Sequence, residues 1–173
     1  MSLLDRRALL AGLALAAAQP LRALADDQPP VTEVWWKDLI PQDENGGTFY
    51  DTLKDIGVVQ HGEMLPWIQQ PPAAMVDTYN DRLVRIPGYV VPLTQDGLGV
   101  TEGLLVPYVG ACIHVPPPPA NQIVFLEFEE PTPQDGLWDP IWATGRFNMA
   151  AVETDLAGVG YVMKNASTEP YTG

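Results

Sequence analysis

Short apolar runs with strand-like alternation dominate the second half of the chain. Proline and glycine together make up 33 of the 173 residues and separate these runs, as turn residues do. Five or six short strands with frequent turns and little helix predict a mainly β fold, a small barrel or a sandwich. The expected strands cover residues 76–79, 82–93, 104–114, 122–128, 140–147 and 159–164.

Two local signals refine this strand pattern. Asn80 and Asp81 tolerate positive φ and separate the runs 76–79 and 82–86, which predicts a hairpin. The pair at positions 87–88, proline followed by glycine, predicts a bulge before the second of these strands continues to residue 93.

Helical spacing is confined to the region before residue 60. Residues 34–41 predict one short helical turn that packs Trp35 and Trp36 inward. Pro41 should stop this turn, because the residue before a proline disfavours helical geometry. Apolar spacing also predicts a short helix over residues 48–56.

The first 25 residues have the order of a cleavable signal peptide. Arg6 and Arg7 precede an apolar run over residues 8–18, and small residues lead to a cleavage site near Ala25. That run is too short to cross a bilayer core of about 30 Å. The paired arginines are similar to the twin-arginine export signal, while the Sec route also remains open. We therefore expect a periplasmic protein with no stable membrane span after cleavage.

Cleavage should leave a flexible lead over residues 26–33, a single β-rich domain over residues 34–167 and a tail over residues 168–173. Residues 1–25 carry three of the nine basic and one of the 22 acidic side chains, so the exported chain has a charge of about −15. Such a surface disfavours nucleic acids and anionic membranes and favours cations and basic protein partners.

The densest chemistry lies between residues 106 and 122. On an extended strand, Cys112 and His114 would project from the same face, and thiolate with imidazole suits zinc or copper. His61 and Glu63 would complete a four-ligand set if the fold brings the two segments together. A packed thiol beside a hydrogen-bonded imidazole is the structural alternative.

Two further interpretations use the same segment. A proline run holds the chain in a stiff polyproline form, which could serve as a metal-free docking surface for a protein partner. A thiol-dependent enzyme would use Cys112 as nucleophile and His114 as base, although neighbours on one strand rarely have that geometry. The expected loop or partner contacts are Tyr108, Pro116, Pro117, Pro118, Pro119 and Asn121.

Residues 85–93 (RIPGYVVPL) and 104–122 (LLVPYVGACIHVPPPPANQ) resemble a bacterial family catalogued as domain of unknown function 3299. Residues 36–41 are similar to its N-terminal signature, and the resemblance covers residues 34–165. The resemblance implies an exported or lipid-anchored protein with an OB-type barrel. It also implies an accessory role, since some members look like components encoded beside transporter systems that respond to zinc. This chain has no cysteine near the cleavage site to carry a lipid.

The residues that match the family by position are Cys112, His114, the proline run and Asn121. We therefore expect a non-enzymatic periplasmic accessory protein that binds Zn(II) or Cu and assists an envelope transporter or another periplasmic protein.

Overall fold

The computed structural model describes residues 29–41, 69, 74–115, 117–133 and 139–172. Their helical elements are two short 3-10 turns, and the helix predicted over residues 48–56 lies outside the described residues. The elements are β1 (Thr32–Glu33), η1 (Trp36–Leu39), β2 (Arg82–Gln95), β3 (Val100–Val106), η2 (Ala120–Gln122), β4 (Val124–Thr132), β5 (Ile141–Glu153) and β6 (Gly158–Pro170).

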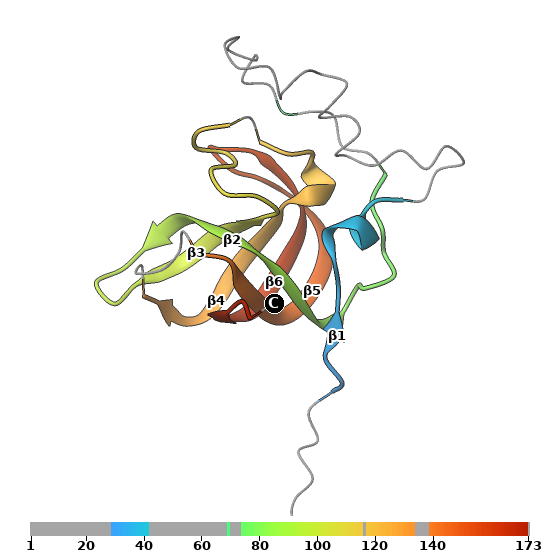
Figure 1. Cartoon of the computed structure of the whole chain (residues 1–173), viewed down its shortest axis with the longest axis horizontal. Coiled ribbons are helices and arrows are strands. Elements are labelled where there is room, and N and C mark those ends of the chain that lie inside the picture. Colours follow the sequence, from blue (N-terminus) through green and yellow to red (C-terminus); the bar gives the residue numbers. More distant parts are fainter. Residues whose placement is uncertain (1–28, 42–68, 70–73, 116, 134–138, 173) are drawn as a thin grey trace, which may run out of the picture.

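The strands form one sheet in the order β1-β2-β3-β4-β6-β5, and a further pairing of β2 with β5 closes it into a barrel (Figure 1). Five strands make the barrel, and β1 adds to β2 in parallel. β4 and β6 are also parallel, whereas the other barrel pairs are antiparallel. This is the order of an OB-type Greek-key barrel, so the barrel prediction is confirmed.

Alternation along the strands fills the barrel. Val84, Ile86 and Val90 of β2 are buried in one core cluster, whereas the side chains between them face outward. Phe147 and Tyr161 stack within this core with ring centroids 4.8 Å apart. The other strand residues of the inner core are Val100, Leu105, Val124, Leu126, Ile141, Ala143, Met163 and Ala166.

β2 closes the barrel because it pairs with two strands in succession. Its first half pairs with β5 as far as Gly88, and its second half pairs with β3 from Tyr89 onward. A Cβ at Gly88 would lie 2.7 Å from the carbonyl oxygen of Val106, so only glycine fits this crossing. The predicted bulge at Pro87 and Gly88 is wrong, since the register with β5 is regular there; the irregularities of β2 lie between Pro92 and Gln95.

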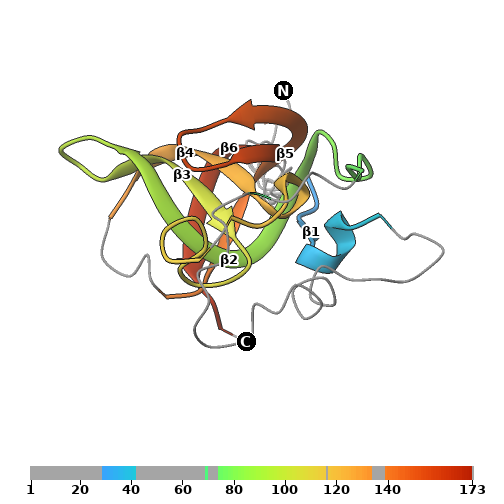
Figure 2. The ribbon, with the colours of Figure 1, turned by 90° about the horizontal axis from the view of Figure 1, so that it is seen from above.

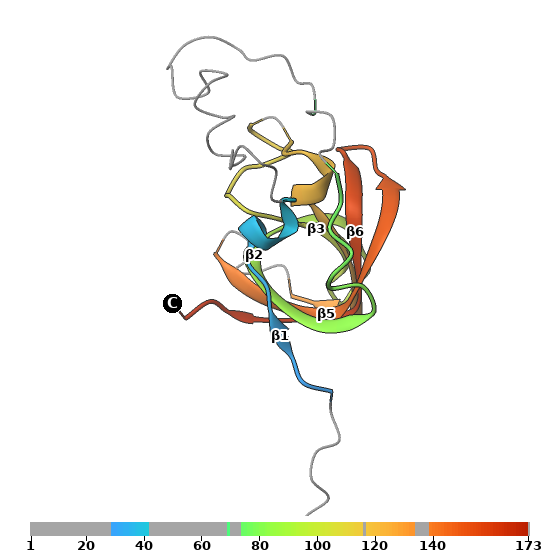
Figure 3. The same cartoon turned by 90° about the vertical axis from the view of Figure 1, so that its right-hand side faces the viewer.

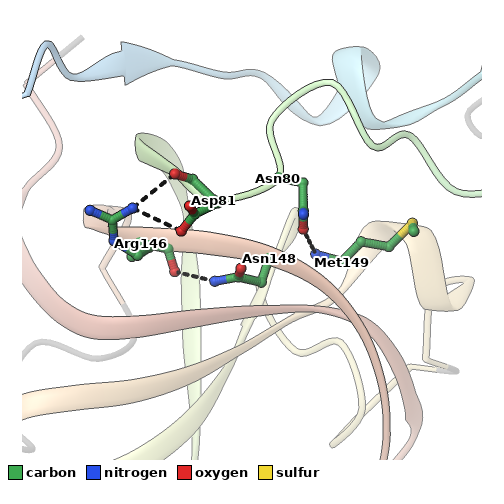
Figure 4. A network of polar contacts seen from close by, with 5 residues as sticks. All are labelled: Asn80, Asp81, Arg146, Asn148 and Met149. Atoms are coloured by element: carbon green, nitrogen blue, oxygen red, sulfur yellow. Dashed lines mark hydrogen bonds and ion pairs between the residues drawn. The ribbon is translucent and has the colours of Figure 1, made fainter.

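The hairpin predicted around Asn80 and Asp81 is also wrong. Residues 78–81 form a turn that leads into β2, and the residues before it are not a strand. Figure 4 shows how this turn is fixed to β5: Arg146 Nη1 donates to the carbonyl oxygen and to Oδ1 of Asp81, at 2.9 and 2.8 Å. The Met149 amide donates to Asn80 Oδ1 at 2.9 Å. The positive φ expected of the turn is present at Asp81, at 57°.

The segment before the barrel packs on it rather than trailing away. Thr32 and Glu33, assigned to the flexible lead, form β1. η1 ends before Pro41 as predicted and buries Trp36 and Leu39 in the inner core. Figure 3 shows η1 and η2 close together beside the barrel.

Two side-chain bonds fix η1. The Trp36 indole N–H donates to the carbonyl oxygen of Pro87 at 2.6 Å, and Gln122 Nε2 donates to the carbonyl oxygen of Trp36 at 3.1 Å. The prediction that Trp35 packs inward is wrong. Trp35 is the residue before the helical turn, and it is 40% exposed.

The later strands also differ at their ends from the prediction. β4 begins at Val124 because η2 occupies residues 120–122. β5 and β6 are longer than expected, since they form a hairpin that pairs as far as Glu153 with Gly158. Residues 168–170, assigned to a tail, are the end of β6.

We expect Trp36→Ala to lower the free energy of unfolding by about 3–5 kcal/mol, because it removes a buried aromatic ring and leaves the Pro87 carbonyl without its donor. Urea denaturation followed by circular dichroism measures this change. Leu98→Ala is the control, since Leu98 is 80% exposed and should change stability by less than about 0.5 kcal/mol. Equal urea midpoints for the two variants would contradict the role of η1.

Candidate functional site

The candidate site lies in the connection between β3 and β4. The predicted strand over residues 104–114 is wrong beyond Val106, where β3 ends and a series of turns begins. Pro107 has no amide proton for a strand ladder, and Gly110 and Cys112 have positive φ values of 81° and 63°. These three residues bend the chain out of the sheet.

A single carbonyl organises the turn of residues 109–115, hereafter the Gly110 turn. The amides of Ile113, His114 and Val115 all donate to the carbonyl oxygen of Gly110, at 3.2, 2.8 and 3.2 Å. A β-bridge between Ala111 and Val115 accompanies these bonds. The backbone of the Gly110 turn is therefore fixed although it belongs to no strand.

The Gly110 turn covers a second hydrophobic core on the outside of the barrel. Val91 of β2 pairs with Leu104 of β3, and Leu104 pairs with Phe125 of β4; these three side chains belong to the second core. Their strand neighbours belong to the inner core, so the second core lies on the opposite, outer face. The side chains of Ala111 and Cys112 are buried on this face. Figure 2, viewed from above, shows the connecting loop in yellow in front of β2.

Cys112 is part of this packing. Its side chain is 3% exposed, and burial raises the pKa of the thiol from 9.0 to about 11. At neutral pH the thiol therefore keeps its proton, whereas a nucleophile or a metal ligand must be a thiolate. This geometry favours the packed thiol of the sequence analysis and gives the thiol-enzyme interpretation no support.

The other side of the Gly110 turn faces solvent. His114 is exposed, and so are two apolar side chains, Val109 at 54% and Ile113 at 38%. The predicted shared face of Cys112 and His114 is wrong, because one side chain is buried and the other is exposed. The prediction failed because it required an extended strand where the chain turns.

The four-ligand metal set is only partly inside the described residues. His61 and Glu63 lie outside them. Within the described part of the chain, no group of three or more His, Cys, Asp or Glu side chains is placed to hold a metal ion. None of the helices in that part is long and apolar enough to cross a membrane.

The described prolines of the run are buried and do not form an open surface. Pro117, Pro118 and Pro119 are buried, and Pro116 lies outside the described residues. Pro119 has the polyproline geometry expected of the run, with φ −55° and ψ 153°. The docking surface predicted on these rings is therefore not exposed.

The remaining predicted contacts also serve packing. Asn121 is 2% exposed and its Nδ2 donates to the carbonyl oxygen of Ala74 at 3.5 Å. Tyr108 is partly buried against the second core. Both side chains therefore contribute to the packing of the loop.

Sequence reasoning missed a side chain that fastens the proline segment. Gln69 Nε2 donates to the carbonyl oxygens of Pro118 and Gly158, at 3.0 and 2.7 Å, and Oε1 accepts the Gly158 amide at 2.8 Å. The side-chain amide of Gln69 thus donates one hydrogen bond to Gly158 of β6 and accepts one from it, as a residue of a neighbouring strand would. No local pattern around residue 69 signals this role, because its partners lie 49 and 89 residues away.

The loop covers part of the face that other OB-type barrels use for ligands. OB-type barrels commonly use the face of their second and third strands for oligonucleotides or oligosaccharides. The corresponding strands here are β3 and β4, and the apolar part of their outer face lies under Ala111 and Cys112. The structure therefore defines an OB-type barrel in which the apolar part of the outer face of β3 and β4 packs against the protein's own β3–β4 loop.

Comparisons with known proteins agree with this class. Residues 36–170 match the family described as protein of unknown function (DUF3299), and the chain belongs to that family. The chain is similar to the crystal structure of a family protein from Pseudomonas aeruginosa PAO1, with 34% sequence identity and a TM-score of 0.65. The match covers 84% of this chain and 98% of that chain. No curated protein matches the sequence.

The buried thiol predicts a loss of stability at alkaline pH. The unfolded thiol ionises near 9.0, whereas the folded thiol keeps its proton up to about 11, so the folded state binds more protons between these values. Relative to Cys112→Ala, the free energy of unfolding of the unaltered protein should therefore fall by up to about 2.7 kcal/mol as the pH rises from 9 to 11.

Urea denaturation at several pH values measures this difference. Burial also raises the pKa of Tyr161, but that residue is present in both proteins and its effect cancels. Parallel pH curves for the two proteins would show that Cys112 is not buried.

Proposed function

We propose that the protein is a non-enzymatic accessory protein of the bacterial envelope that binds a protein of a transport system through the Gly110 turn. The observation that carries this proposal is the exposure of Val109, Ile113 and His114 on a backbone fixed by three bonds to one carbonyl. A rigid surface with apolar side chains loses little conformational entropy on binding. The proposal moves the expected docking surface from the prolines to the residues that precede them.

Export supports the same role. The signal-like residues 1–25 favour a periplasmic location, by the twin-arginine or the Sec route. The acidic charge of the chain favours a partner with a basic surface and speeds its association. The accessory role beside a transporter rests on the family resemblance.

Binding of Zn(II) or Cu at the Gly110 turn is the second candidate function. The exposed His114 imidazole favours it, with the Cys112 thiol two residues earlier in the chain. The metal would have to displace the thiol proton and draw Cys112 out of the second core, because a thiolate is the ligand. His61 and Glu63 are the proposed additional ligands.

Site-specific photocrosslinking tests the docking proposal. A photoreactive residue at Val109 or Ile113 should crosslink to one envelope protein in the periplasmic fraction, since both side chains face the proposed partner. Leu98 is the matched control, because it is apolar and more exposed but lies in the β2–β3 hairpin. The same crosslinked product from Leu98, or no product from the turn, would contradict the proposal.

Competition with a chromophoric zinc chelator tests the metal candidate. If Cys112 binds as a thiolate, the apparent affinity should rise about tenfold for each pH unit between 7 and 9, because one proton leaves for each metal bound. Cys112→Ser should abolish this dependence, and His114→Ala should weaken binding. His61→Ala and Glu63→Gln test the other two ligands. Equal affinity in all variants, or no affinity, would contradict metal binding at the turn.

A further inference from the structure

A cluster of aromatic rings lies outside the Gly110 turn and includes none of its residues. Trp142 of β5 contacts Trp35 edge to face with ring centroids 5.7 Å apart, and it contacts Tyr171 at 5.2 Å. Trp142 is 5% exposed, whereas Trp35 is 40% exposed. One buried indole therefore supports a second indole that faces solvent.

An ion pair borders this aromatic cluster. The Arg85 guanidinium lies over the Trp142 ring, 4.2 Å from its centroid, and its Nη2 lies 2.7 Å from Glu169 Oε1. Trp142 pairs directly with Glu169 of β6, so the strand register places the carboxylate beside the ring. The Glu169 side chain is 57% exposed and keeps acceptor capacity for a ligand.

The backbone holds these groups in place before any ligand arrives. The Val34 amide donates to the carbonyl oxygen of Arg85 at 2.9 Å, which positions Trp35 beside β2. The Trp35 amide donates to Asp38 Oδ2 at 2.9 Å. The Tyr171 amide donates to the carbonyl oxygen of Pro140 at 3.0 Å, which fixes the chain end beside β5.

The aromatic cluster and the Gly110 turn are separate surfaces. Trp142 lies near the start of β5, and Val152, which packs against the second core, lies near its end. The aromatic cluster and the Gly110 turn share no residue. Figure 1 shows β1 at the lower end of the barrel and the yellow β3–β4 loop at the upper end. A ligand of the aromatic cluster therefore does not depend on the proposed function of the turn.

The chemistry of the cluster points to an uncharged ring that carries hydroxyl groups. The acidic chain repels anionic ligands, and the guanidinium of Arg85 is already paired with a carboxylate. An exposed indole offers a flat apolar face for the C–H groups of a ring, while a carboxylate accepts hydrogen bonds from hydroxyl groups and a guanidinium donates them. A pyranose ring has both kinds of surface.

We propose that Trp35, Arg85 and Glu169 form a binding site for the pyranose ring of an uncharged or N-acetylated glycan. Trp35 supplies the stacking face, and the Arg85–Glu169 pair contacts the ring hydroxyls. The same sugar chemistry occurs in soluble oligosaccharides and in the glycan strands of a cell wall. The experiment below separates these two sources.

The test uses chitotetraose and cellotetraose as soluble probes and purified peptidoglycan sacculi as the polymeric probe. Titration with a soluble probe should change tryptophan fluorescence saturably, with a dissociation constant in the millimolar range, and sacculi should co-sediment with the protein. Binding to the tetramers identifies soluble sugars as ligands, and binding to sacculi alone identifies the wall polymer. The proposal is overturned if the protein binds none of the three probes.

Variants tie binding to the cluster. Trp35→Ala should weaken binding about tenfold, and Trp35→Tyr should retain most of it, because a second aromatic ring can still stack. Glu169→Gln should also weaken binding, and it keeps the shape of the side chain if Trp35→Ala fails to fold. Leu98→Ala is the control and should bind as the unaltered protein does. Equal binding by Trp35→Ala, Glu169→Gln and Leu98→Ala overturns the proposal.

Discussion

The double pairing of β2 is the constraint on which the rest of the structure depends. Its first half pairs with β5 and its second half with β3, so a single strand closes the barrel. The change of partner occurs at Gly88, where the Val106 carbonyl leaves no room for a side chain. Closure places Val106 at the end of β3, directly before the chain turns out of the sheet. The position at which β3 ends therefore decides where the Gly110 turn lies and which side chains it covers in the second core.

Burial of both faces of β3 explains why residues 106–122 do not present Cys112 and His114 on one face, as the sequence predicts. β3 buries Leu105 inside the barrel and Leu104 outside it, and the outer side chain needs a cover. Ala111 and Cys112 provide this cover, which raises the thiol pKa and leaves the next residues exposed. One loop thus covers the outer core with its buried side and leaves Val109, Ile113 and His114 exposed on its other side.

The sequence predicts the barrel because strand alternation and turn residues are local signals. It also predicts the positive φ at Asp81 and the end of η1 before Pro41. It does not predict that the strand ends at Val106, because apolar residues continue beyond Val106. Only their packing on the outer core shows that these residues cover the barrel instead of extending the strand. The sequence does not predict the Arg85–Trp142–Glu169 group, because three strands contribute to it and Glu169 lies in the expected tail.

The central claim is that the Gly110 turn is a rigid cover over an outer core. Amide hydrogen exchange measured by NMR tests it most directly, because the amides of Ile113, His114 and Val115 donate to one carbonyl. We expect these three amides to exchange as slowly as those in the centre of β3. Exchange as fast as that of the exposed β2–β3 hairpin at Leu98 would contradict the claim.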